Sequence, residues 1–347
     1  MRRPVGRHIL FGLAILLIVI VCLEGITRLW AKYVIANPPA VVPATLGQFD
    51  RQLGWSLKPL SRATSERTGY RIEYKINSKG LRDDETTYEK PSSIFRIVIV
   101  GDSHTFGYGV PIEKHFSKLI ESYLEGVEVI NMGVNAFGLD QMLLYLKSEG
   151  FRYQPDLVVA YVPHYADHRH MYRERYGKQK PRFRLENGRL MLINSPVPAP
   201  SNVSKPSARI NDLVTKYSLF YRKISDVLSS PVASNETGRD QNKTSDFMKA
   251  LFELGEVLVR EMRQESLKHG AHFVLVTKMK ELHKFCQTEG ILSLDVSNAL
   301  SNRRFALPEN LGHMNEAGNG ALAWEIARFL QSKGWARTGS YDDDPQI

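Results

Sequence analysis

Cysteine is scarce in this chain of 347 residues, which contains only Cys22 and Cys286. Cys22 falls inside an apolar run near the N-terminus, so a single cysteine remains in the rest of the chain. An intramolecular disulfide is therefore excluded outside that run. The stability of this larger part must come from a buried core, which a chain of this length can supply.

The chain also lacks a nucleic-acid-binding motif, although its formal net charge is +9. Its basic residues are scattered, and such a charge equally suits an acidic glycan or an anionic lipid surface. Metal binding has little support, because His164, His168 and His170 have arginines as neighbours and no carboxylate-supported motif completes a ligand set. We expect no nucleic-acid partner, no metal and no cofactor.

An uninterrupted apolar run extends from Ile9 to Leu23 and follows several arginines near the N-terminus. A cleaved signal peptide is one interpretation, because its apolar core is roughly 7–15 residues long. No small-residue cleavage site directly follows this run, which favours an uncleaved anchor. We therefore predict a cytoplasmic N-terminus at residues 1–8 and a transmembrane anchor at residues 9–30. The rest of the chain would lie on the extracytoplasmic side of the membrane, periplasmic or extracellular.

Beyond the anchor, residues 31–93 combine a proline- and alanine-rich spacer with short mixed segments that suggest a small β-rich lead-in. Residues 94–335 then alternate compact β-branched runs with helical patterns. The runs are Arg96–Val100, Val127–Ile130, Leu157–Val162 and His272–Val276, and the helical patterns are His115–Leu124, Leu139–Lys147 and Asp246–Lys268. This alternation predicts an α/β fold with a doubly wound parallel sheet. Residues 167–244 break the pattern and are interpreted as an insertion, and residues 336–347 as a flexible tail.

Candidate chemistry lies where these strands end, because ligands of open α/β sheets bind beyond the carboxyl ends of the strands. The first strand is followed by Gly101-Asp102-Ser103, and the second by Asn131-Met-Gly133-Val. Glycine permits tight turns and close backbone approach, and a serine at a helix start has its own N–H facing a developing oxyanion. A late histidine, His313, precedes the C-terminal amphipathic helix. Taken singly, each segment also suits an ordinary turn or loop.

In this order, Gly-Asp-Ser, Asn-x-Gly-Val and a late His-x-Asn before a helix resemble the SGNH hydrolases, also called GDSL-like, over about residues 96–335. The lead-in resembles that of membrane-anchored bacterial members through Leu53-Gly-Trp55 and Ile76-Asn-Ser-Lys-Gly-Leu-Arg82. The resemblance implies a flavodoxin-like three-layer sandwich with Ser103 as nucleophile and His313 as general base. It also implies an oxyanion hole built by the backbone N–H of Ser103, a backbone N–H in the family's second sequence block, here Asn131–Gln141, and an asparagine side chain in its third block, here Tyr161–Asp167.

Three positions depart from the family's pattern. Ala136 occupies the position of the family's second-block glycine. We take Ala136 and Gly133 as the candidate residues whose backbone forms the oxyanion hole and binds substrate. The third block has no asparagine, which leaves His164 as the candidate donor. The family's Asp-x-x-His reads Asn310-Leu-Gly-His, and the adjacent Glu309 is out of register. Replacing this acid by an amide lowers the rate of a serine protease about 10⁴-fold.

Together these features predict a membrane-anchored, extracytoplasmic serine esterase that removes O-acyl groups, chiefly acetyl, from a glycan or a small ester. Two alternatives remain open. One is a glycan O-acyltransferase that uses the same residues, and the other is a non-catalytic glycan-binding or assembly protein with a degenerate site. Turnover of a simple acetyl ester separates an enzyme from a binding protein, and acyl transfer to an added glycan separates a transferase from a hydrolase.

Overall fold

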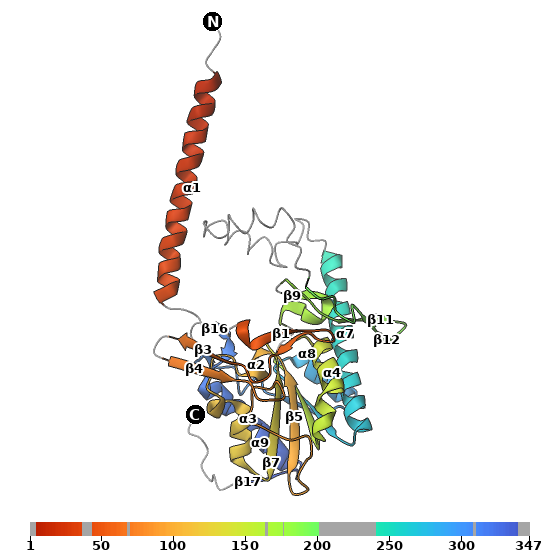
Figure 1. Cartoon of the computed structure of the whole chain (residues 1–347). Coiled ribbons are helices and arrows are strands. Elements are labelled where there is room, and N and C mark those ends of the chain that lie inside the picture. Colours follow the sequence, from red (N-terminus) through yellow and green to blue (C-terminus); the bar gives the residue numbers. More distant parts are fainter. Residues whose placement is uncertain are drawn as a thin grey trace. The chain divides into compact units, whose positions relative to one another are not determined.

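The computed structural model describes residues 5–36, 44–67, 70–163, 166–175, 177–200, 241–307 and 310–338 (Figure 1). The chain divides into two compact units. One unit comprises Met1–Pro39 and Ser201–Thr244, and the other comprises Ala40–Pro200 and Ser245–Ile347. The candidate residues of the sequence analysis all fall in the second unit.

In the first unit the structure describes helix α1, which covers Val5–Ala36 and includes the apolar run. When only the described residues are considered, no helix is long and apolar enough to cross a membrane. The anchor at residues 9–30 stays a prediction from the sequence.

A five-stranded parallel sheet forms the centre of the second unit, with the strand order β14-β13-β8-β5-β7. The bounds are β5 Phe95–Gly101, β7 Val127–Gly133, β8 Leu157–Val162, β13 His272–Thr277 and β14 Ser293–Asp295. Counted from β5 along the chain, this is the flavodoxin-like order 2-1-3-4-5, in which ligands bind where the order reverses, beside the first strand. The α/β class and the four predicted strands are confirmed, whereas the sequence pattern does not predict β14.

Helices cover both faces of this sheet (Figure 1). Alternate residues of a strand point to opposite faces. Ile97 and Ile99 therefore share a core with α3 and α9, whereas Val98 and Val100 share the other core with α4, α7 and α8. The bounds are α3 Phe116–Tyr123, α4 Leu139–Ser148, α7 Gln241–Lys268, α8 Lys280–Thr288 and α9 Glu316–Ser332. The three-layer arrangement and the predicted helices are thus present, with α8 in addition.

The segment before the sheet contains two antiparallel hairpins. Their strands are β1 Gly47–Asp50, β2 Gly54–Leu57, β3 Arg62–Arg67 and β4 Tyr70–Lys75. Trp55 and Tyr74 belong to the same core as Val98. Arg82, only 1% exposed, donates hydrogen bonds to the carbonyl oxygens of Phe106 and Gly107. This lead-in therefore shares its core with the sheet domain.

The remaining short elements surround the sheet. The strands are β6 Leu124–Glu125, which pairs with β17 Arg337–Thr338, then β9 Glu174–Arg175, β10 Lys178–Gln179, β11 Arg182–Glu186, β12 Arg189–Ile193, β15 Ala306–Leu307 and β16 Asn310–Met314. The short helices are α2 Ser103–Phe106, η1 Ala44–Leu46, η2 Ile112–Lys114, η3 Gly150–Tyr153, η4 Ala166–Met171 and η5 Arg303–Phe305.

A buried ion pair connects the predicted insertion to α4. Lys180, between β10 and β11, pairs with Asp140 in the first turn of α4, and neither side chain is exposed to solvent. The ammonium group of Lys180 also donates to the carbonyl oxygens of Tyr172 and Pro181, at 3.1 and 2.9 Å. Hydrogen bonds of this kind are what a buried charge requires.

We predict that Lys180→Met lowers the free energy of unfolding by about 3–5 kcal/mol, because the Asp140 carboxylate would stay buried without its cation. Urea denaturation measures the change, and the double variant Lys180→Met/Asp140→Leu should recover much of the loss. The matched control is Arg260→Met, which breaks a partly exposed pair with Glu289 and should cost less than about 1 kcal/mol. Equal losses for the two single variants would contradict the prediction.

Candidate active site

Ser103 begins α2, a single helical turn that directly follows β5. Asp102 caps this turn, and its Oδ1 accepts a hydrogen bond from the N–H of His104 at 2.9 Å. The turn ends at Gly107, whose φ of 81° lies in the left-handed region that favours glycine. The side chain of Ser103 therefore occupies a fixed place at the carboxyl edge of the sheet.

Two glycines allow α2 to lie close against the strand ends. A Cβ at Gly133 would lie 2.1 Å from the backbone nitrogen of Phe106, and a Cβ at Gly101 would lie 1.9 Å from Oγ1 of Thr105. The N–H of Gly133 donates to the side chain of Asn131 at 3.0 Å. The structure thus gives Gly133, a predicted oxyanion and substrate residue, a packing role behind the nucleophile turn.

The structure brings the two central predicted residues together. Oγ of Ser103 and Nε2 of His313 are 2.7 Å apart, although 210 positions separate them in sequence. His313 lies on β16, which pairs with β15. This distance suits proton transfer from a hydroxyl to an imidazole. Nε2 can accept the proton only when the ring is neutral and carries its hydrogen on Nδ1.

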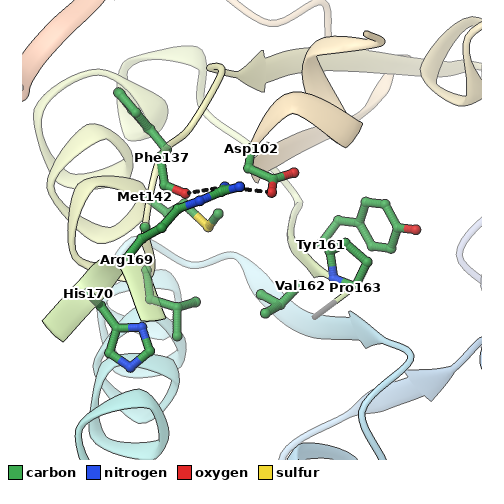
Figure 2. Close-up of a pocket in the computed structure, with 10 residues that line it drawn as sticks. Asp102, Phe137, Met142, Tyr161, Val162, Pro163, Arg169 and His170 are labelled. Carbon is green, nitrogen blue, oxygen red and sulfur yellow. Dashed lines mark hydrogen bonds and ion pairs between the residues drawn. The ribbon is translucent and has the colours of Figure 1, made fainter. Parts of the chain in front are cut away.

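Asp102 forms an ion pair that links three loops of the site. Nη1 of Arg169, in η4, lies 2.8 Å from Oδ2 of Asp102 and also donates to the carbonyl oxygen of Phe137 at 3.1 Å (Figure 2). The side chains of Arg169 and Asp102 are only 11% and 5% exposed, so solvent weakens the pair little. The loops after β5, β7 and β8 are therefore tied together. In the sequence, Arg169 is only one of several arginines among histidines.

The second block adopts the backbone that a glycine favours. Ala136 has a φ of 65°, in the left-handed region, which costs an L-residue roughly 1–2 kcal/mol. The preceding residue, Asn135, accepts a hydrogen bond from the indole N–H of Trp55 at 3.0 Å. The lead-in thus helps to hold this strained loop, and the left-handed φ makes this a position that favours glycine.

Three of the predicted positions cannot be placed in full. His164 and Glu309 lie outside the described residues, and for Asn310 the backbone alone is described, paired with Leu307. Their roles stay predictions. Nε2 of the buried His170 is 3.0 Å from the carbonyl oxygen of Leu251. Within the described ranges, no group of at least three His, Cys, Asp or Glu residues could hold a metal ion.

Tyr161 and His115, both buried near the site, each stay in their neutral form near neutral pH. Burial, and then the charge of Asp102, raise the pKa of Tyr161, so its phenol stays protonated. Burial, and then the charge of Arg82, lower the pKa of His115 to about 3. Nε2 of the neutral His115 lies 3.2 Å from the carbonyl oxygen of His104. Neither group suits proton transfer near neutral pH.

Two hollows open at this edge of the sheet. A cavity of about 20 Å³ adjoins Asp102 and Arg169 and has room for about one water molecule (Figure 2). A groove of about 530 Å³ adjoins His104 and Gly312, the sequence neighbours of Ser103 and His313. The other residues that line it are Pro163, Lys278, Met279, Lys280 and Glu281. Its size is that of small-molecule sites, so it is the candidate substrate groove.

Comparisons with known proteins find distant similarity in fold. No family model and no curated protein matches the sequence. Among solved structures, a member of the lipolytic protein G-D-S-L family from Veillonella parvula is 12% identical, with a TM-score of 0.35, over 68% of this chain and 98% of its own. A catalytic mutant of an acetylxylan esterase from Geobacillus stearothermophilus is 14% identical, with a TM-score of 0.36, over 72% and 100%. An alpha/beta hydrolase enzyme from the metagenome of Lake Arreo, Spain, is 14% identical, with a TM-score of 0.37, over 72% and 98%.

We predict that Gly133→Ala lowers the free energy of unfolding by about 3 kcal/mol, because the added Cβ meets backbone atoms of α2 that a side-chain rotation cannot move. The matched control is Gly320→Ala in α9, where a Cβ has nothing within 4 Å and where alanine should add about 0.5–1 kcal/mol. Denaturant unfolding of both variants measures the difference. A stable Gly133→Ala variant would contradict the close packing of α2 on β7.

Proposed function

We propose that this chain is a serine ester hydrolase that removes O-acyl groups, acetyl in particular, from a glycan or a related ester. The observation that carries the proposal is the 2.7 Å separation of Ser103 Oγ and His313 Nε2 at the carboxyl edge of the sheet. An unassisted serine hydroxyl is a weak nucleophile near neutral pH, and an adjacent imidazole is the usual means of activating it.

In the proposed reaction, Oγ of Ser103 attacks the ester carbonyl carbon while His313 takes the hydroxyl proton. The negative oxygen that forms is stabilised by backbone N–H groups, for which Ser103 and Ala136 are the candidates. The imidazolium then returns the proton to the leaving alcohol, which leaves an acyl-serine. Water, deprotonated by the same imidazole, attacks the acyl-serine. The imidazolium then returns its proton to Oγ of Ser103 as the Oγ–acyl bond breaks, which releases the carboxylic acid and restores the free serine.

The same chemistry also permits transfer, since a sugar hydroxyl can replace water in the second half of the reaction. The candidate groove beside His104 and Gly312 is large enough, at about 530 Å³, for an acylated sugar unit. The proposal includes an extracytoplasmic location, which the apolar run of residues 9–23 and the arginines before it support. Acetate release measured with and without an added glycan acceptor separates hydrolysis from transfer.

We expect Ser103→Ala to lower turnover of an activated acetyl ester by at least about 10³-fold, because the attacking atom is removed. Thermal stability should change little, since the hydroxyl lies at the end of a strand and not in the core. His313→Ala should lower the rate to a similar degree. The control is Ser122→Ala. The hydroxyl of Ser122 lies on the exposed side of α3 and donates a hydrogen bond to the carbonyl oxygen of Leu119 in the same helix. Full activity in Ser103→Ala would exclude Ser103 as nucleophile.

We further expect Asn310→Asp to raise the ester turnover by tenfold or more, towards the limit of about 10⁴-fold set by a complete triad. A carboxylate beside the imidazole would favour the imidazolium that forms as Ser103 loses its proton, and it would raise the pKa of His313. Because the base must be neutral to act, the acid limb of the pH–rate profile should move to higher pH. An unchanged rate and profile would show that residue 310 does not support His313. If Asn310→Asp turned over the ester and the natural chain did not, the natural chain would be a binding protein.

A further inference from the structure

Two aromatic rings pack against the imidazole of His313. The ring of His104 lies nearly parallel to it, with centroids 4.7 Å apart and an interplanar angle of 16°. The ring of Tyr108 lies 4.3 Å from it at an angle of 31°. The His104 distance falls within the range of about 4.5–7 Å at which aromatic rings attract one another beyond simple burial, and the Tyr108 ring lies slightly closer. We call His104 and Tyr108 the aromatic support.

His104 lies in the turn that carries the nucleophile, and Tyr108 directly follows Gly107, where that turn ends. His104 directly follows Ser103, and the backbone N–H of Tyr108 donates to the carbonyl oxygen of Ser103 at 3.0 Å. A movement of this turn would therefore shift Ser103 together with the two rings that pack on His313. The separation of Oγ and Nε2 is preserved by this connection.

The backbone and the ring of His104 are themselves fixed. Its N–H donates to Oδ1 of Asp102 at 2.9 Å, and its carbonyl oxygen lies 3.2 Å from Nε2 of His115. Its ring meets the edge of Tyr161 at 6.1 Å and 89°, and only 7% of the residue is exposed. A side chain fixed in this way provides a rigid surface for another ring.

We infer that His104 and Tyr108 are positioning residues, which hold the imidazole of His313 against Ser103 by stacking. In a catalytic triad a carboxylate orients the imidazole, and the sequence places an amide, Asn310, where that carboxylate is expected. Stacking orients the plane of the ring without a charge. The inference concerns the base of the proposed ester hydrolysis and rests on that function for its kinetic consequence.

The kinetic test uses the full chain and an activated acetyl ester. His104→Ala should lower kcat about tenfold, the rate equivalent of one stacked pair, and should leave KM within about twofold. His104→Phe retains a flat ring in the same place and should recover most of that loss, as Tyr108→Phe should relative to Tyr108→Ala. A phenylalanine variant as slow as the alanine variant, or a change in KM alone, would overturn the inference.

A stacked pair outside the site provides the matched control. The rings of Phe151 and His269 lie 3.9 Å apart at an angle of 2°. Phe151→Ala removes a ring from a histidine in the same domain and should leave kcat unchanged. A tenfold loss in this control would show that general loosening of the fold accounts for the effect.

Crystal structures of the variants test the inference even if the wild type turns over no ester, in which case the proposed function fails by itself. In His104→Ala the imidazole of His313 should turn so that Nε2 leaves hydrogen-bond distance of Ser103 Oγ. In His104→Phe the 2.7 Å separation should persist. An unmoved imidazole in both variants would show that the aromatic support does not position the base.

Discussion

The packing of one helical turn against a strand end governs the geometry of this site. The backbone of α2 approaches Gly133 so closely that a single methyl group would meet the nitrogen of Phe106 at 2.1 Å. The guanidinium of the buried Arg82 donates hydrogen bonds to the carbonyl oxygens of Phe106 and Gly107, at the end of that same turn. A hydroxyl group at the start of such a turn has few positions available. The 2.7 Å approach of Ser103 to His313 follows from that restriction as much as from the residues themselves.

Segments outside the sheet complete the site. Trp55 of the lead-in bonds the loop that contains Ala136, and Arg169 of η4 bonds both Asp102 and Phe137. These contacts join the ends of β5, β7 and β8, the strands on either side of the point where the strand order reverses. The lead-in and the start of the predicted insertion thus act on the site through hydrogen bonds and buried charge. Their loss would loosen the loops without removing a reacting atom.

The sequence predicted those parts of the fold that are encoded by local patterns. Runs such as Leu157–Val162 are apolar on both sides because the strand is buried on both faces, and such runs are recognisable without a structure. The strand β14 has three residues and a mixed composition, so no periodicity marks it. Ser103 and His313 were found because each sits in a short motif. These motifs are contacted by Arg169 and by the ring of Tyr108. Such contacts form between distant loops, so no local sequence pattern predicts them.

The charges near His313 determine how much the aromatic support can contribute to holding its imidazole in place. Asp102, the carboxylate nearest to Ser103 in sequence, accepts hydrogen bonds from Arg169 and from the N–H of His104, so its charge is already compensated. An imidazolium at His313 would face the rings of His104 and Tyr108, and a cation–π contact with the Tyr108 ring would contribute about 0.5–2 kcal/mol. A tenfold change in rate corresponds to about 1.36 kcal/mol, so the 10⁴-fold effect of a triad carboxylate corresponds to about 5.4 kcal/mol. Stacking can orient the base and offset part of that difference, but it cannot replace the carboxylate. For the proposed reaction, we therefore expect residue 310 to set the upper limit of the rate and the aromatic support to determine how much of that limit the geometry reaches.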